Sequence, residues 1–239
     1  MKRIVKSLLL RAGWEIHRTD DAHRSSMTGG LRRLANRGTR FNTVLDVGAS
    51  DGRWTEQCME FFPDAKYLLF EPQPVHAPAL DAFVGRHRES VVAIKKAVGA
   101  SEGFTYFDAS DPLGGALAEQ EGAETIQVSL TTLDAAITET GAQPPYLLKL
   151  DTHGFERSIL GGASKTLEHC EALIIEAYNF RISGEAMLFW ELCALVSAKG
   201  FRTVDVADVL RRPGDNALWQ MDLFFIRSNW TGFELNSYR

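Results

Sequence analysis

Short apolar runs alternate with amphipathic stretches from Phe41 to the end of the chain. This alternation is typical of a mostly parallel β-sheet that is covered by helices on both faces. The sequence therefore predicts an α/β fold. Strands are expected at residues 43–47, 67–71, 91–95, 146–150, 172–176, 202–206 and 221–226, and helices over 53–62, 75–86, 132–139, 156–168 and 185–199.

One segment breaks the alternation. Residues 104–128 contain a strand pattern, a loop with Gly114 and Gly115, an acidic turn and a second strand pattern. We expect a hairpin insertion over one edge of the sheet. Because internal repeats and low-complexity linkers are absent, residues 41–239 are predicted to form one domain, preceded by a partly helical basic arm at residues 1–40.

Charge divides unevenly between this arm and the rest of the chain. Residues 1–40 carry ten basic and three acidic side chains, whereas the whole chain has a formal net charge of −5. An acidic domain repels polyphosphate, so we expect no nucleic-acid partner. The basic and apolar residues of the arm fit either a helix packed on its own domain or peripheral contact with an anionic membrane.

The cellular location follows from three further features of the sequence. No stretch reaches the roughly 20 uninterrupted apolar residues that cross a bilayer, and the N-terminus is a poor signal peptide. The three cysteines (Cys58, Cys170 and Cys193) are widely spaced and suggest neither a disulfide framework nor a thiol zinc site. We expect a cytoplasmic protein, with peripheral attachment at the inner face of the membrane as the alternative. The oligomeric state is not indicated.

A glycine-rich turn follows the first expected strand. Gly48-Ala49-Ser50-Asp51-Gly52 comes directly before a helix, at the carboxyl edge of the sheet, where open α/β sheets bind ligands. Gly48 leaves no side chain between this turn and a bound molecule. Glu71 ends the second strand and can accept hydrogen bonds from both hydroxyls of a ribose. These residues predict a nucleoside cofactor; the alternative is a tight turn with an exposed glutamate.

Two observations favour S-adenosyl-L-methionine over NAD as this cofactor. A G-x-G-x-x-G motif that starts at Gly48 would need glycine where the chain has Ser50 and Arg53. The carboxylates of Asp46 and Asp51 would repel a pyrophosphate, whereas S-adenosyl-L-methionine carries a sulfonium, an ammonium and only one carboxylate.

The fourth expected long strand ends in a group of reactive side chains. Asp151 and His153 follow it, at the same edge of the sheet as the glycine-rich turn. Methyl transfer to a hydroxyl requires alignment of the acceptor and removal of a proton. Asp151 or His153 could take that proton, and we place His153 slightly ahead because its ordinary pKa is about 6.5.

Other polar residues near this edge are candidates for binding the acceptor. Glu156 begins a helix, so it either complements the helix dipole or binds substrate. Glu176 ends the fifth long strand and precedes Asn179, and both are expected to face the acceptor. Asp151 and Glu176 could instead hold a divalent metal, but no dense acidic cluster accompanies them, so a metal is not favoured.

Several sequence blocks, in this order, resemble the FkbM family of methyltransferases. They cover roughly residues 42–227 and are far more specific together than one glycine loop. The blocks are DVGASDG (46–52), FEPQP (70–74), TLD (132–134), KLDTHGFE (149–156), LGGA (160–163) and IIE (174–176).

This resemblance implies a Rossmann-like class I methyltransferase fold with seven strands, S-adenosyl-L-methionine as the donor, and O-methylation of a sugar or polyketide hydroxyl. It implies that Glu71 contacts the ribose and that Ala97 and Val98 line the adenine. The chain departs from the family at Ser50, where Asn is frequent, and at Thr152-His153, where Val-Gln or Val-Glu is frequent. The expected cofactor-binding residues are Asp46, Gly48, Ala49, Ser50, Gly52, Glu71, Pro72, Ala97 and Val98.

We therefore expect an O-methyltransferase that acts on a sugar hydroxyl of a glycan or glycosylated small molecule. Two alternatives stay open at this point: a non-catalytic protein that binds the cofactor, and an NAD-dependent oxidoreductase. The acceptor itself cannot be identified from these residues.

Overall fold

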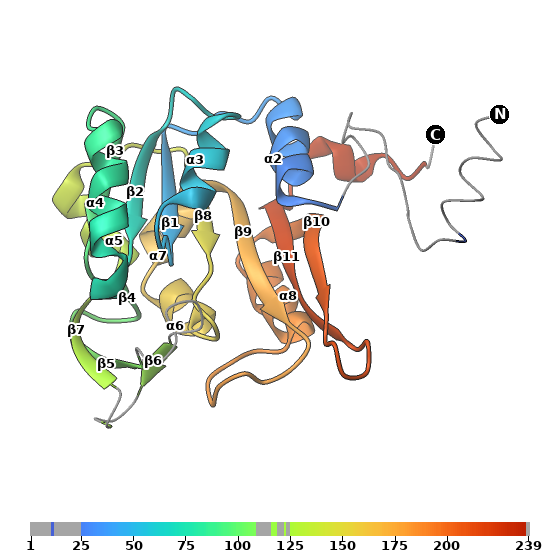
Figure 1. Ribbon diagram of the computed structural model, residues 1–239. Coiled ribbons are helices and arrows are strands. Elements are labelled where there is room, and N and C mark those ends of the chain that lie inside the picture. Colours follow the sequence, from blue (N-terminus) through green and yellow to red (C-terminus); the bar gives the residue numbers. More distant parts are fainter. Residues whose placement is uncertain (1–10, 12–24, 109–115, 119–121, 123–124, 238–239) are drawn as a thin grey trace.

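The computed structural model describes residue 11 and residues 25–108, 116–118, 122 and 125–237. Its centre is a seven-stranded sheet with the strand order β10-β11-β9-β8-β1-β2-β3 (Figure 1). The five strands from β9 to β3 in this order pair in parallel, whereas β10 and β11 run antiparallel at one edge. The strands are β1 (Thr43–Val47), β2 (Lys66–Phe70), β3 (Val91–Ile94), β8 (Tyr146–Leu150), β9 (Cys170–Tyr178), β10 (Phe201–Arg211) and β11 (Leu218–Arg227).

Helices bury both faces of this sheet, which explains the unbroken apolar runs in the sequence. Every residue of β1 and β8 is buried, as expected for parallel strands covered on both sides. One hydrophobic cluster joins one face to α5, α6, α7 and α8, and a second joins the other face to α2, α3 and α4. These helices are α2 (Met27–Asn36), α3 (Arg53–Met59), α4 (Ala77–Arg86), α5 (Leu133–Thr140), α6 (Glu156–Gly161), α7 (Ser164–Glu168) and α8 (Phe189–Ala198).

Two expected helices differ from the observed ones. The helix expected over 156–168 is divided into α6 and α7, and Gly162 between them lies against the backbone of Gly99. A Cβ atom on Gly162 would lie 2.2 Å from the carbonyl oxygen of Gly99. The helix expected from residue 185 begins only at Phe189, where the side chain of Glu191 accepts a hydrogen bond from the N–H of Leu188 and caps the first turn.

The expected hairpin insertion is part of a separate four-stranded sheet. β5 (Gly103–Asp108) and β7 (Thr125–Thr131) pair antiparallel as predicted, and β4 (Ala97–Val98) and β6 (Ala116–Ala118) extend the sheet in the order β4-β7-β5-β6. Figure 1 shows this small sheet at the lower left, below α4 and the β2–β3 side of the main sheet. It brings Ala97, Val98 and Phe107 to the ends of the parallel strands.

Part of the predicted basic arm is packed on the domain. Leu31 and Leu34 of α2 are buried in the second hydrophobic cluster, and each such leucine contributes about 2 kcal/mol of hydrophobic stabilisation. Arg33 also forms two hydrogen bonds to the carboxylate of Asp205 in β10. The arm's expected membrane-contacting residues, before residue 25, lie almost entirely outside the described part of the chain. No described helix has the length and apolarity needed to cross a membrane.

Candidate active site

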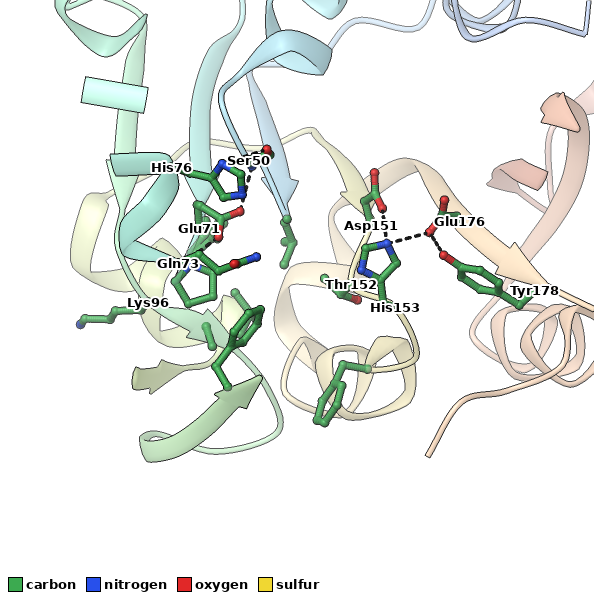
Figure 2. A pocket seen from close by; sticks show the side chains of 18 of the residues that line it. Ser50, Glu71, Gln73, His76, Lys96, Asp151, Thr152, His153, Glu176 and Tyr178 are labelled. Atoms are coloured by element: carbon green, nitrogen blue, oxygen red, sulfur yellow. Dashed lines mark hydrogen bonds and ion pairs between the residues drawn. The ribbon is translucent and has the colours of Figure 1, made fainter. Parts of the chain in front are cut away.

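A cavity of about 540 Å³ opens at the carboxyl ends of the parallel strands. Strands β1, β2, β8 and β9 all end there, so the loops that follow them surround one space (Figure 2). The small sheet closes one end of the cavity, and the β10–β11 hairpin contributes Leu210 and Gln220 at the other. We call these the donor end and the acceptor end.

Gly48 allows the loop after β1 to lie against the loop after β8. Its φ angle is +83°, and a Cβ atom there would lie 2.0 Å from the carbonyl oxygen of Asp151. Such a contact is impossible for any other residue type. The backbone N–H groups of Gly48 and Ala49 both donate to the carbonyl of Phe70, which holds this loop at the end of β2.

Glu71 is the central polar group of the donor end. It is 5% exposed, its Oε2 accepts a hydrogen bond from the N–H of Ser50 at 2.9 Å, and its Oε1 accepts one from the N–H of Gln73 at 2.8 Å. Burial raises the pKa of Glu71 in spite of these two donors. A carboxylate has about four acceptor positions, so each oxygen can still accept a ribose hydroxyl.

The donor end combines this carboxylate with apolar walls. Ala97 and Val98 of β4 and Pro72 line it, as predicted, together with Phe107 of β5. Small and flat apolar surfaces of this kind suit a purine ring. The residues present therefore fit the nucleoside part of S-adenosyl-L-methionine.

Several residues of the donor end were not predicted from the sequence. His76, which no sequence motif marked, lines the cavity, and its Nδ1 lies 3.4 Å from Oγ of Ser50. Gln73 directly follows Glu71 and Pro72, so its place in the sequence could have indicated that it lines the cavity. Lys96 and Phe107, in contrast, reach the cavity only through the position of the small sheet.

Three predicted cofactor residues lie beneath the cavity rather than on its wall. Asp46, Ala49 and Gly52 are all buried and do not line it. Asp46 accepts a hydrogen bond from Oγ1 of Thr55 at 2.6 Å, and burial raises its pKa. Its carboxylate therefore binds α3, the helix that follows the glycine-rich loop.

The acceptor end brings together side chains from the loop after β8 and from β9. Nε2 of His153 lies 3.7 Å from Oδ1 of Asp151 and 3.6 Å from Oε2 of Glu176. Figure 2 shows the imidazole ring between the two carboxyl groups. The hydroxyl of Tyr178 and the amide of Gln220 donate hydrogen bonds to Oε2 and Oε1 of Glu176, respectively. Tyr178 and Gln220 were not predicted.

The two carboxyl groups at this end titrate differently. Burial and the nearby charge of Asp151 raise the pKa of Glu176 to about 8. Burial also opposes ionisation of Asp151, but the ammonium group of Lys149, 3.0 Å from Oδ2, outweighs it and lowers the pKa of Asp151. At neutral pH the negative charge therefore resides on Asp151 while Glu176 is mainly protonated.

Asp151, His153 and Glu176 each offer one ligand atom within 4.8 Å of the other two. This spacing is compatible with a divalent cation. However, Lys149 already compensates Asp151, and both oxygens of Glu176 accept hydrogen bonds. These contacts satisfy both carboxyl groups by protein side chains, and we assign no metal.

Two predicted substrate residues do not line the cavity. Glu156 is 4% exposed, and its Oε1 accepts hydrogen bonds from the N–H of Gly154 and the hydroxyl of Thr152. It thus stabilises the turn before α6 and has a structural role at the start of this helix. The amide of Asn179 donates to the carbonyl of Leu218 and joins the ends of β9 and β11.

The strand order and a cavity at the carboxyl edge of the sheet define a class I methyltransferase fold. The sequence profile of the methyltransferase FkbM domain matches residues 46–203. The chain therefore belongs to the FkbM methyltransferase family, and its methyl donor is S-adenosyl-L-methionine. No curated protein matches the sequence.

Solved structures are similar to this chain at low sequence identity. The FkbM methyltransferase from Methylobacillus flagellatus is 14% identical, with a TM-score of 0.53; the match covers 84% of this chain and 48% of that protein. The present chain thus spans about half the length of that relative. A putative O-methyltransferase from Klebsiella pneumoniae is 12% identical, with a TM-score of 0.46 and coverages of 94% and 89%.

Proposed function

We propose that this chain transfers a methyl group from S-adenosyl-L-methionine to a hydroxyl group of a sugar, in a glycan or a glycosylated small molecule. The observation that carries the proposal is the carboxyl group of Asp151, 3.0 Å from the ammonium group of Lys149, at the acceptor end of the cavity whose donor end contains Glu71. The donor, when bound, supplies a methyl group activated by its sulfonium. The residues of the chain must then orient the acceptor and receive its proton.

The donor end supplies the contacts that would hold the cofactor. Glu71 would accept hydrogen bonds from the ribose hydroxyls, and Ala97, Val98 and Phe107 would enclose the adenine. Because Glu71 is already fixed by the N–H groups of Ser50 and Gln73, its carboxylate is held in place before the ligand arrives. Such preorganisation lowers the entropic cost of binding.

Asp151 is the group that we favour as the proton acceptor. Its charge is maintained by Lys149, whereas Nε2 of His153 is directed toward two carboxyl groups. The structure therefore shifts our preference from His153 to Asp151. In this mechanism Asp151 would receive the proton of the acceptor hydroxyl, while the bound donor would supply the methyl group and leave as S-adenosylhomocysteine when its methyl carbon–sulfur bond breaks. His153 binds and orients the two carboxyl groups. A positioned base of this kind typically accelerates a reaction by about 10²–10⁴-fold.

The polar groups of the acceptor end support a polyhydroxylated acceptor. Glu176 and Gln220 provide hydrogen-bonding groups next to Asp151, and the ring of Tyr178 provides an apolar wall beside them. Tyr178 is itself fixed by the edge of the Trp219 ring, with 6.2 Å between the ring centroids. A rigid aromatic wall with several hydrogen-bonding groups suits a sugar better than an apolar acceptor.

Two measurements test this function. Calorimetry with S-adenosylhomocysteine should show binding, whereas NAD should not bind; the reverse would indicate an oxidoreductase. Cell-envelope glycans incubated with the chain and methyl-labelled donor should then gain label that resists alkali, as a methyl ether does. Label released by alkali as methanol would indicate carboxyl methylation and contradict the proposal. Binding without any transfer would favour a non-catalytic protein.

The same proposal extends to partners and location. A glycan acceptor agrees with the acidic charge of the domain, which disfavours nucleic acid. A cytoplasmic location, with residues 1–24 in peripheral contact with the inner face of the membrane, is the arrangement we propose for an acceptor attached to lipid.

A further inference from the structure

Lys149 is a charged residue in the middle of a buried strand. Its side chain is 4% exposed, and it interrupts the otherwise apolar sequence of β8. Removing an ammonium group from water is costly unless it is paired with an opposite charge. The neighbours of Lys149 must therefore account for its position.

Two carboxylates face the ammonium group, one from β1 and one from the loop after β8. Its Nζ atom lies 3.0 Å from Oδ2 of Asp151 and 3.4 Å from Oδ1 of Asp46. Asp46 is the residue of β1 that lies directly opposite Lys149 in the β1–β8 register. Among the residues that the structure describes, no hydrogen bond reaches Oδ1 of Asp46, so its charge compensation comes from Lys149. The ring of Trp54 also lies against Nζ, with 5.2 Å from Nζ to the ring centroid.

This contact links the two ends of the cavity. Asp46 lies in β1, the strand that leads into the glycine-rich loop of the donor end, and its other oxygen is fixed by Thr55 of α3. Asp151 lines the acceptor end, where it lies near Glu176 and His153. A single ammonium group thus connects the strand before the donor loop with the proposed base next to the acceptor.

We infer that Lys149 is a positioning residue for methyl transfer: it joins Asp46 to Asp151 and keeps the negative charge of the acceptor end on Asp151 rather than on Glu176. This inference rests on the proposed function, because it assigns a purpose to the charge of Asp151. Lys149 itself does not line the cavity that holds the donor and acceptor ends. It acts through the two carboxylates.

The charges around Lys149 agree with this role. Three carboxyl groups face Lys149: Asp46 from β1, Asp222 from β11 and Asp151 from the end of β8. Asp151 in turn lies next to Glu176 of β9 and next to His153. Burial opposes the charge of Lys149, but Asp151 and Asp46 outweigh burial and raise its pKa, so it stays a cation. Burial raises the pKa of Asp222 to about 7, so this carboxyl group competes only partly for the ammonium.

Lys149 lines a second, smaller cavity of about 260 Å³ on the side away from the acceptor end. Asp151 lines both cavities, so removal of Lys149 would leave this carboxylate near Asp222 and Asp208 without the ammonium group that lies 3.0 Å from its Oδ2. The residues that line the second cavity are Met27, Arg53, Trp54, Gln57, Lys149, Asp151, Asp208 and Asp222.

The test replaces the ammonium while avoiding two unpaired buried charges. Lys149→Met alone would leave Asp46 and Asp151 facing each other, a repulsion that can prevent folding. The informative comparison is therefore Asp46→Asn against the double variant Asp46→Asn/Lys149→Met. Aspartate labelled with ¹³C at the carboxyl carbon reports the titration of Asp151 by NMR, with the signal assigned by Asp151→Asn. Circular dichroism checks the fold of each variant.

We expect the titration midpoint of Asp151 to be about one pH unit or more higher in the double variant than in Asp46→Asn. The same midpoint in both proteins would overturn the inference, because Lys149 would then only fill space. Calorimetry with S-adenosylhomocysteine on the wild type separates the two proposals. Failure of the wild type to bind contradicts the proposed function, whereas an unchanged midpoint in a chain that binds contradicts only the role of Lys149.

Discussion

The Nε2 atom of His153 lies 3.6 Å from Oε2 of Glu176, so the imidazole of the loop after β8 faces a carboxyl group of the neighbouring strand. Asp151 completes this group at 3.7 Å from the same nitrogen. The arrangement of these three side chains therefore sets the chemistry of the acceptor end. This relationship and those around Glu71 lead to five predictions.

Substitution of Asp151 or His153 should reduce methyl transfer and leave donor binding nearly unchanged. Asp151→Asn removes the proposed base, and we expect transfer to glycan extracts to fall about 10²–10⁴-fold. His153→Ala should reduce transfer less, because its part is to orient the carboxyl groups. Affinity for S-adenosylhomocysteine, measured by calorimetry, should change little in either variant.

His169→Gln is the matched control for these changes, since His169 is exposed and does not line the cavity. It should transfer methyl groups at the wild-type rate. A larger loss of transfer in His153→Ala than in Asp151→Asn would reverse the assignment of the base.

Glu71→Gln should weaken cofactor binding. The amide keeps one acceptor oxygen, so one of the hydrogen bonds from Ser50 and Gln73 is lost and the ribose meets a poorer acceptor. We expect a loss of about 1–3 kcal/mol in the free energy of binding S-adenosylhomocysteine. Calorimetry on this variant and on Glu89→Gln, an exposed glutamate, measures the difference. Equal affinities would remove Glu71 from the binding site.

Gly48→Ala should disrupt the donor loop. The new methyl group would collide with the carbonyl oxygen of Asp151 and would occupy a backbone conformation with φ of +83°. The loop must move, so binding of S-adenosylhomocysteine should be lost and the melting temperature should decrease.

Gly85→Ala provides the matched control, because a Cβ atom on this residue of α4 would meet no described atom within 4 Å beyond the backbone of its own helix. Alanine is a better helix former than glycine, so this variant should be more stable by about 0.5–1 kcal/mol. A Gly48→Ala protein with normal affinity and stability would show that the two loops do not approach as described.

Glu176 should make the stability of the protein depend on pH. Its pKa is raised from 4.5 to about 8 in the folded chain, so the folded state binds its proton more tightly than the unfolded state. The associated stabilisation is fully present below about pH 4.5 and is lost as the pH rises through about 8. Relative to Glu176→Gln, the free energy of unfolding of the wild type should fall by on the order of 3 kcal/mol across this interval. Urea unfolding of both proteins at several pH values measures it, and parallel pH curves would contradict the raised pKa.

Removal of divalent cations should leave transfer intact. Lys149 compensates Asp151, and Tyr178 and Gln220 donate to Glu176, so these groups have partners within the protein. We expect chain dialysed against EDTA to transfer labelled methyl groups at the same rate before and after addition of Mg²⁺ or Mn²⁺. Activity that requires one of these cations would instead assign Asp151, His153 and Glu176 as its ligands.

Local patterns in the sequence predicted the strands of the sheet well. The expected strands 43–47 and 146–150 coincide with β1 and β8, because strands that are buried on both faces need unbroken apolar runs. Local signals in the sequence also identified the loop Gly48-Ala49-Ser50 and Glu71, because a turn with positive φ and a carboxylate at a strand end belong to short segments. The family and the fold class followed from the sequence blocks that resemble FkbM methyltransferases, and both are confirmed.

Residues whose function depends on distant partners could not be assigned in this way. The sequence suggested that Asp46 contacts the cofactor and that Glu156 contacts the substrate, yet both carboxylates point to partners inside the protein. His76, Phe107 and Tyr178 line the cavity without a local motif that marks them. Whether a polar side chain faces a ligand or a buried neighbour depends on packing between elements.

The amino-acid sequence thus determined the order of strands and helices, the glycine loop and the carboxylate at the end of β2, because periodicity, backbone conformation and strand ends are properties of short segments. Only the tertiary structure decided which of two neighbouring carboxyl groups carries the charge. That decision depends on the burial of Glu176 and on the 3.0 Å distance between Lys149 and Asp151, and the electrostatic energy of a group is set by the charges and the solvent around it in space.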